Sequence, residues 1–91
     1  MKDEMLKDAS YVKISSYRLR VVEVLDRNGG VMMPMEIARE SGILPNHISK
    51  VLRELKDKGI LECLNEDARK GRLYRLTGYG WGVVGLLKSV F

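Results

Sequence analysis

The sequence has 91 residues, enough for one compact domain and too few for a second. Because 45% of the residues are hydrophobic and 31% are charged, the composition excludes disorder over most of the chain. The net charge of +4 suits a polyanionic partner without requiring one, and the single cysteine, Cys63, excludes an internal disulfide and a thiolate metal cage. One thiol also indicates an intracellular protein, which we expect to be cytoplasmic.

The first ten residues, MKDEMLKDAS, are charged and lack an apolar core. They therefore do not form a signal peptide, and they predict a flexible tail over residues 1–10 that precedes a domain at 11–91. The only long apolar stretch, GWGVVGLLKSVF, contains Lys88 and is well short of the ~20 residues that span a bilayer. We expect a soluble protein with no membrane partner.

A helix is predicted after the tail, capped by Ser15 or Ser16 and ended by Asn28-Gly29-Gly30. Its apolar residues share one broad stripe, formed by Tyr17, Val21, Val22, Val24 and Leu25. The short apolar segment VMM that follows predicts a strand stub or an extended link.

Two short helices come next. Pro34 suits the first turn of a helix that ends at Gly42, because proline lacks the N–H that this position leaves unpaired. Pro45 then opens a second helix over 45–58, which stops at Gly59.

Beyond Gly59, the segments ILECLN and RLYRLT predict two strands, and the polar loop EDARKG between them is too long for a tight turn. Tyr74 and Leu76 share one face of the second strand and are expected to close the core. Thr77 can cap a last helix over 78–91, although four glycines weaken its helix propensity. This order of elements predicts a mainly α fold with a small antiparallel β-hairpin.

The two short helices also show the spacing of a helix-turn-helix. Because three or four residues join them, the helices must cross at a steep angle. Ala38 is small where the second helix approaches, and Gly42 permits the turn. Ile48 and Val51 supply the facing apolar wall, and this spacing is typical of the motif.

The stretch PMEIARESGILPNHISKVLRELKDKGILE, continued by NEDARKGRLYRLTGYG, resembles the winged helix-turn-helix transcriptional regulators of prokaryotes, in the broad MarR/ArsR neighbourhood. The resemblance covers about residues 16–82 and rests on EIA…SGI, HISKVLRELKDKGIL and KGRLYRLT in this order. Leu44 departs from the pattern, since serine or threonine is commoner before the recognition helix, and we expect Pro45 to set the helix start instead. The resemblance implies a winged helix-turn-helix fold with the hairpin as its wing.

In the resembling family the second helix of the pair enters the major groove of double-stranded DNA. The resemblance implies DNA contacts from the outward face of helix 45–58, through Asn46, His47, Ser49, Lys50 and Arg53. An Asn side chain suits adenine, Arg or Lys suits guanine, and the serine suits a phosphate. The wing at 66–72 is expected to follow the flanking backbone through Arg69, Lys70 and Arg72.

A plainer explanation of these residues stays open. Polar side chains on a helix often only face water, and Arg53–Asp57 or Glu54–Lys58 can form pairs across one turn. For Lys56 and Lys58 we prefer this explanation. A charged hairpin tip is likewise consistent with solubility alone.

The sequence shows no set of residues for a metal site or a catalytic centre. His47 and Cys63 lie on different predicted elements, and neither a glycine-rich phosphate loop nor a nucleophile motif is present. We therefore expect no enzymatic activity, no cofactor and no metal. Cys63 is expected to be a small apolar strand residue, with a redox switch as the alternative.

The C-terminal helix, 78–91, is apolar on nearly every side, and such a helix usually covers a second surface. Outer helices of the resembling family often form two-fold dimers. We expect this helix, together with the predicted helix that starts at Ser15 or Ser16, to form a homodimer interface. Gly78, Gly82 and Gly85 would permit close approach of the helices there. The expected interface residues are Trp81, Val84, Leu87 and Phe91. Alternatively, one side packs in the domain and the other is an exposed or membrane-adjacent patch.

Together these features predict a sequence-specific DNA-binding transcriptional regulator. We expect a dimeric repressor, because so short a chain has little surface for recruiting polymerase. One alternative is a winged-helix protein-interaction module in a larger assembly. Another is an architectural protein that binds DNA without sequence preference.

Overall fold

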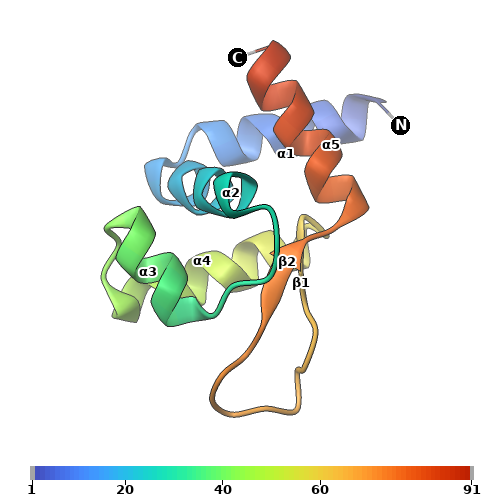
Figure 1. Ribbon diagram of the computed structural model, residues 1–91. Coiled ribbons are helices and arrows are strands. Elements are labelled where there is room, and N and C mark those ends of the chain that lie inside the picture. Colours follow the sequence, from blue (N-terminus) through green and yellow to red (C-terminus); the bar gives the residue numbers. More distant parts are fainter. Residues whose placement is uncertain (1, 91) are drawn as a thin grey trace.

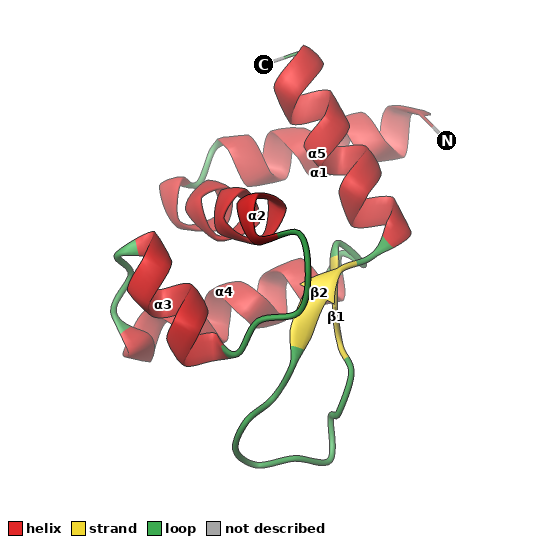
Figure 2. Cartoon of the chain, viewed as in Figure 1, coloured by secondary structure: helices red, strands yellow, loops and turns green. Residues whose placement is uncertain are grey.

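Helices and one β-hairpin build the protein, whose computed structural model describes residues 2–90 (Figure 1). The elements in chain order are α1 (Lys2–Lys13), α2 (Ser16–Asn28), α3 (Pro34–Ser41), α4 (Pro45–Asp57), β1 (Leu61–Cys63), β2 (Tyr74–Leu76) and α5 (Gly78–Ser89). Helices α1 and α5 cross at one end of the molecule, α2 lies in the middle, and α3, α4 and the hairpin lie at the other end (Figures 1 and 2). The predicted fold class, mainly α with a winged helix-turn-helix, is confirmed.

The prediction of a flexible tail over residues 1–10 is wrong, because residues 2–10 belong to α1. Ala9 and Val12 are fully buried, and Met5 packs against the same core. These three residues are spaced by four and three, which places them on one side of a helix. A helix this short is marginal alone, and it folds here because that side is covered, chiefly by α5. The expected domain boundary between residues 10 and 11 therefore falls inside a helix.

The next helix, α2, begins and ends as predicted. The Ser15 hydroxyl accepts a hydrogen bond from the Arg18 backbone N–H at 3.2 Å, and Gly29 closes the C-terminus. Val21, Val22 and the other buried residues of α2 place this helix between the two ends of the molecule. Because every other helix contacts α2, it is the element on which the rest is assembled.

Helices α3 and α4 form the predicted helix-turn-helix. Gly42 adopts a φ of 74° in the turn, a backbone conformation that other residues resist, and Ala38 is buried at the helix crossing. Arg20 of α2 also supports the turn, because its Nη1 donates to the Ser41 carbonyl at 3.1 Å. As expected, α4 starts at Pro45 without any side-chain cap from Leu44.

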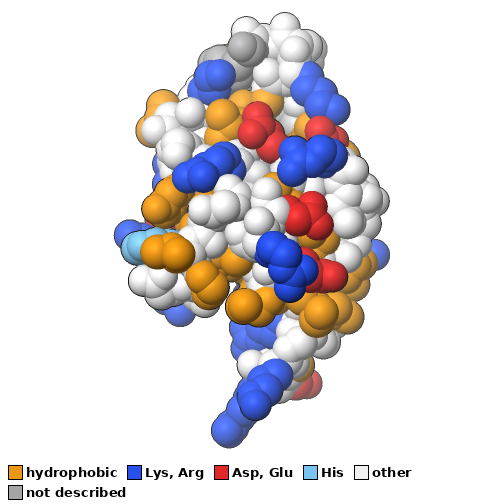
Figure 3. Space-filling model, turned by 60° about the vertical axis from the view of Figure 1, so that its left-hand side comes forward, with side chains coloured by type: hydrophobic (Ala, Val, Ile, Leu, Met, Phe, Trp, Pro, Cys, Tyr) orange, Lys and Arg blue, Asp and Glu red, His pale blue; other side chains and the backbone are white. Residues whose placement is uncertain are grey.

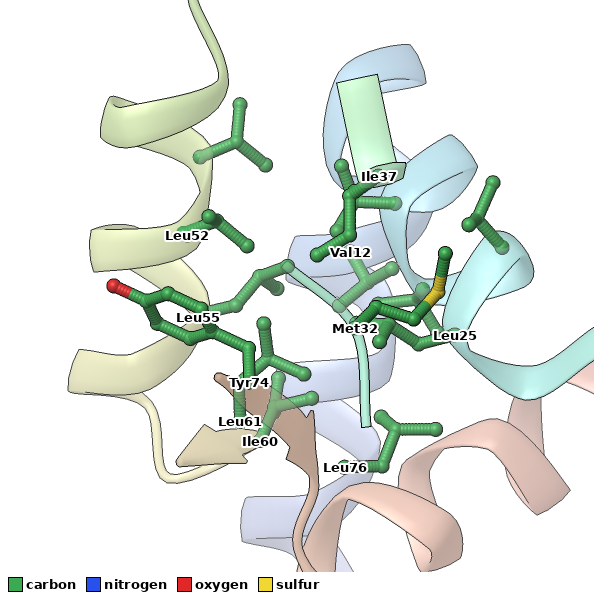
Figure 4. Packing of buried hydrophobic residues seen from close by; sticks show 14 of the residues in the cluster. Val12, Leu25, Met32, Ile37, Leu52, Leu55, Ile60, Leu61, Tyr74 and Leu76 are labelled. Atoms are coloured by element: carbon green, nitrogen blue, oxygen red, sulfur yellow. The ribbon is translucent and has the colours of Figure 1, made fainter. Parts of the chain in front are cut away.

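The hairpin strands pair antiparallel, with Leu61 opposite Leu76 and Cys63 opposite Tyr74. Each strand has three residues and is shorter than predicted. The VMM segment adds an isolated bridge, because the Met32 N–H and carbonyl bond the carbonyl and N–H of Tyr74, both at 2.9 Å. Tyr74 and Leu76 are buried as expected and belong to the cluster of hydrophobic side chains in the core (Figure 4).

The last helix, α5, starts at the predicted cap, where the Thr77 hydroxyl accepts a hydrogen bond from the Gly80 N–H at 2.8 Å. At Gly80 the helix lies so close to the chain before β1 that an added Cβ would be 2.1 Å from the Ile60 carbonyl oxygen. Within residues 2–90 no helix is both long enough and apolar enough to cross a membrane.

Candidate nucleic-acid interface

The polar face of α4 is turned to solvent. Ile48, Val51, Leu52 and Leu55 are buried on the inner side of this helix. The five α4 residues expected to contact DNA lie on the other side and are exposed, namely Asn46, His47, Ser49, Lys50 and Arg53. The strong separation of the two faces follows from the 3.6-residue period of the sequence.

His47 differs from its neighbours because its ring lies beside an aromatic side chain. The centroids of the His47 and Tyr17 rings are 5.6 Å apart, with the planes tilted by 47°. Tyr17 also lies beneath the Arg20 guanidinium, at 5.2 Å. These contacts hold His47 toward α2, at the edge of the exposed α4 face.

One groove joins α4 to the wing. Ser49 and Arg53 line it from the helix, and Arg69, Lys70 and Arg72 line it from the loop between β1 and β2. Lys and Arg side chains gather at the protruding end of the molecule (Figure 3). The structure therefore brings two of the predicted helix residues and all three predicted wing cations to one concave surface. Asn46, His47 and Lys50 are exposed outside the groove lining.

The three wing cations do not have the same surroundings. The Arg72 guanidinium donates to two backbone carbonyls of its own loop, from Nε to Ala68 at 2.8 Å and from Nη2 to Glu66 at 3.0 Å. Among residues 2–90, the side chains of Arg69 and Lys70 make no hydrogen bond or ion pair. Arg72 is thus a structural residue of the loop as well as a source of charge.

An ion pair that the sequence did not indicate links α4 directly to the wing. The Lys56 ammonium lies 3.0 Å from the Glu66 carboxylate. The hydrogen bond from Lys56 and the negative charge of Glu66 raise the pKa of Lys56. Both side chains are well exposed, so the pair contributes little to stability, and it lies between α4 and the start of the loop after β1.

The pairs expected across one turn of α4 do not form among the described residues. Glu54 instead pairs with Arg18 of α2, at 3.4 Å from Nη1, and Lys58 lies 4.8 Å above the Tyr11 ring. Arg18 is mostly buried, and its Nε donates to the Tyr11 carbonyl of α1 at 2.9 Å. Contacts between residues so far apart in sequence leave no local pattern, so the sequence could not reveal them.

The expected dimer surface is only partly available. Trp81 is 42% exposed and Leu87 is half-buried, whereas Val84 is 5% exposed and packs in the chain's own core. Val84 is therefore not an interface residue, because its side chain is already covered. Phe91 lies outside the described residues.

The glycines of α5 divide in the same way. A Cβ on Gly82 would be 2.7 Å from the Met5 methyl of α1, so that position is already packed within the chain. Gly78 and Gly85 have open space around them and remain free for close contact.

Within residues 2–90 no group of three His, Cys, Asp or Glu side chains could hold a metal ion. Cys63 is half-buried in β1, and its thiol lies 3.6 Å from the Asn65 side-chain oxygen. Its place in the strand is the one expected from the sequence.

The crossed helices, the exposed α4 face and the wing define a winged helix-turn-helix protein, with the fold of prokaryotic MarR-family transcriptional regulators. The chain belongs to the O-methyltransferase dimerisation domain family, whose model matches residues 9–84. No curated protein matches the sequence.

Two solved structures resemble the chain. The crystal structure of the AntR antimony-specific transcriptional repressor has a TM-score of 0.72 and 27% identity, over 91% of this chain and 70% of that one. A MarR-family transcriptional regulator from Silicibacter pomeroyi also has a TM-score of 0.72, with 20% identity over 94% of this chain and 57% of that one. The second likeness concerns the fold alone, and this chain spans little more than half of that regulator.

Proposed function

We propose that the protein is a sequence-specific, double-stranded DNA-binding transcriptional regulator that acts as a dimeric repressor. The observation that carries this proposal is the single groove shared by the exposed α4 face and the wing cations. A recognition helix in the major groove and a wing on the adjacent backbone require the two elements to face the same side. The similarity to the structure of a transcriptional repressor agrees with it.

In this proposal the exposed face of α4 reads bases and the wing contacts phosphates. Asn46 is suited to adenine, and Lys50 or Arg53 to guanine. Ser49 and His47, which are exposed on the same helix, are proposed to contact phosphates. Arg69 and Lys70 extend from the wing, where a flexible cation can follow the backbone or enter the minor groove.

The dimer is proposed to form through the α1 and α5 end, opposite the wing (Figure 1). Leu6 of α1 and Trp81 of α5 are exposed apolar side chains on these two helices. The family description, a dimerisation domain, supports pairing of two chains. A two-fold dimer would present two recognition helices to a palindromic site.

Duplex binding tests the proposal. Sites are first selected from a random duplex pool, and the affinity for the selected site and for random duplex is then measured over a range of salt concentrations. We expect affinity to fall by orders of magnitude from low to moderate salt, because phosphate contacts release counterions.

Lys50→Ala and Arg53→Ala supply the variant arm of this experiment. Each is expected to cost about 1–3 kcal/mol on the selected site and less on random duplex, because a base contact is lost. Asp57→Ala is a control on the same exposed face of α4. Equal losses on both duplexes would instead identify an architectural protein without sequence preference.

A second candidate function is a protein-interaction module, which the family description favours, since it names dimerisation and not DNA. In that case α5 would pair with a different chain. Absence of binding to any duplex at low salt would support this candidate and reject the DNA-binding proposal.

A further inference from the structure

The wing loop is held by one amide side chain that joins its two legs. Asn65 follows β1, and its Oδ1 accepts a hydrogen bond from the Leu73 N–H at 2.8 Å. Its Nδ2 donates to the Gly71 carbonyl at 3.1 Å. The backbone pair from the Leu64 N–H to the Leu73 carbonyl, 2.8 Å, lies beside it. The loop between the strands is thus closed by specific bonds.

Arg72 holds the far side of the same loop. Its guanidinium donates from two nitrogens to the carbonyls of Glu66 and Ala68, which belong to one turn. A planar guanidinium presents several donors in a rigid fork, so it can bind two such carbonyls at once, whereas the single ammonium of lysine lacks this geometry. With Asn65, Arg72 leaves the loop little freedom apart from its tip.

The tip of the loop carries two cations whose side chains make no hydrogen bond or ion pair among residues 2–90. Arg69 and Lys70 lie between Ala68 and Gly71, two of the positions whose carbonyls are bonded by Arg72 and Asn65. The Lys56–Glu66 pair joins the base of this turn to α4. The tip cations therefore extend from a loop that is already ordered in the free protein. Less conformational entropy is then lost when the loop binds.

We propose that Asn65 and Arg72 are positioning residues that shape the wing before binding, and that Arg69 and Lys70 alone are its phosphate-contacting cations. This inference rests on the proposed DNA-binding function. It assigns to Arg72 a different role from the direct contact that the sequence suggested. Two kinds of variant separate the roles.

The first test is the salt dependence of duplex affinity. Each phosphate contact adds about 0.9 to the slope of log affinity against log salt. Lys70→Gln should reduce this slope by about that amount. Arg72→Gln should weaken binding roughly five- to tenfold at every salt concentration with the slope unchanged, because it loosens the loop without removing a phosphate contact. A slope that falls equally in both variants would overturn the inference.

The second test keeps the charge. Lys70→Arg should bind like the wild type, because either cation can contact a phosphate. Arg72→Lys should lose about as much affinity as Arg72→Gln, because an ammonium cannot hold both carbonyls. Full affinity of Arg72→Lys would show that Arg72 acts through its charge, and the inference would be wrong.

A third measurement needs no DNA. Amide hydrogen exchange of Leu73 reports the bond to Asn65, and Asn65→Ala should speed this exchange at least tenfold while the amides of α4 keep their protection. Unchanged exchange at Leu73 would overturn the positioning role. If the wild-type protein binds no duplex at low salt, the proposed function fails, and this exchange measurement still decides whether Asn65 shapes the wing.

Discussion

Tyr79 illustrates how single side chains connect the two ends of the sequence. Its hydroxyl donates to the Asp8 carboxylate of α1 at 2.5 Å, although 71 positions separate the two residues. Burial of the hydroxyl, followed by this hydrogen bond and the nearby negative charge, raises the pKa of Tyr79 from 10.0 to about 12. The bond joins α5 to a segment whose sequence looks like a charged tail.

The raised pKa predicts a pH dependence at the alkaline end. The neutral phenol is the form that donates to Asp8, so the contribution of this bond to the free energy of unfolding is complete below pH 10.0 and is lost as pH rises through about 12. Ultraviolet titration should show a late-ionising phenol that is missing in Tyr79→Phe. The same titration curve in the wild type and in this variant at the alkaline end would contradict the prediction.

Two glycines of α5 give a second prediction for single residues. Gly80→Ala places a Cβ against the Ile60 carbonyl, a backbone group that cannot move away, and should lower the free energy of unfolding by about 1–3 kcal/mol or more. Gly85→Ala enters open space and should raise it by roughly 0.5–1 kcal/mol through helix propensity. Urea denaturation measures both. Similar destabilisation by the two variants would argue against the close packing at Gly80.

Among the elements, those with strong end signals could be predicted from the sequence. Ser15, Pro34, Pro45 and Thr77 mark helix starts by chemistry that acts over a few residues, and the structure confirms each start. The face of α4 that meets solvent could also be predicted, because its apolar residues repeat with a helical period.

What could not be predicted depends on contacts between distant segments. Helix α1 has an apolar side of only three residues, Met5, Ala9 and Val12, in a segment that is otherwise largely charged. This side is stabilised as a helix because α5 packs against it. The burial of Val84 and the role of Arg72 also come from tertiary packing and loop geometry. No pattern in the local sequence distinguishes Arg72 from Lys70.

For α1 as an element, we expect Val12 to contribute to the common core. Val12→Ala should lower the free energy of unfolding by about 1–2 kcal/mol, since it removes buried methyl groups and leaves a cavity. Ile14→Ala, two residues later and 79% exposed, should change it by less than about 0.5 kcal/mol. Equal, small effects in urea denaturation would mean that α1 is not part of the cooperative fold.

At the scale of the whole molecule, the proposed function requires one surface for DNA and another for a second chain. The loop between β1 and β2 carries the exposed cations Arg69 and Lys70, while Leu6 of α1 and Trp81 of α5 are exposed apolar side chains. Other exposed apolar side chains, Met35 and Leu44, lie at the helix-turn-helix, so exposure alone does not distinguish the two surfaces.

A substitution at Trp81 tests the proposed dimer. Trp81→Glu should weaken self-association by about 2 kcal/mol or more, roughly thirty-fold in the dissociation constant, if this indole is central to the interface. Leu64→Glu, on an equally exposed apolar residue near the wing, should leave it unchanged. Sedimentation of the wild-type chain as a monomer at tens of micromolar would remove the dimer proposal.

Arg18 bonds the Tyr11 carbonyl of α1 with one nitrogen and the Glu54 carboxylate of α4 with another. The orientation of α4 is thereby linked to α1, one of the two helices through which two chains are proposed to pair. In a dimer, the separation between the two α4 helices would follow from how α1 is seated, and with it the number of base pairs between half-sites. Loss of the two hydrogen bonds of the Arg18 side chain is therefore expected to broaden the range of spacer lengths between half-sites that the proposed dimer binds. The affinity for each half-site is expected to stay the same.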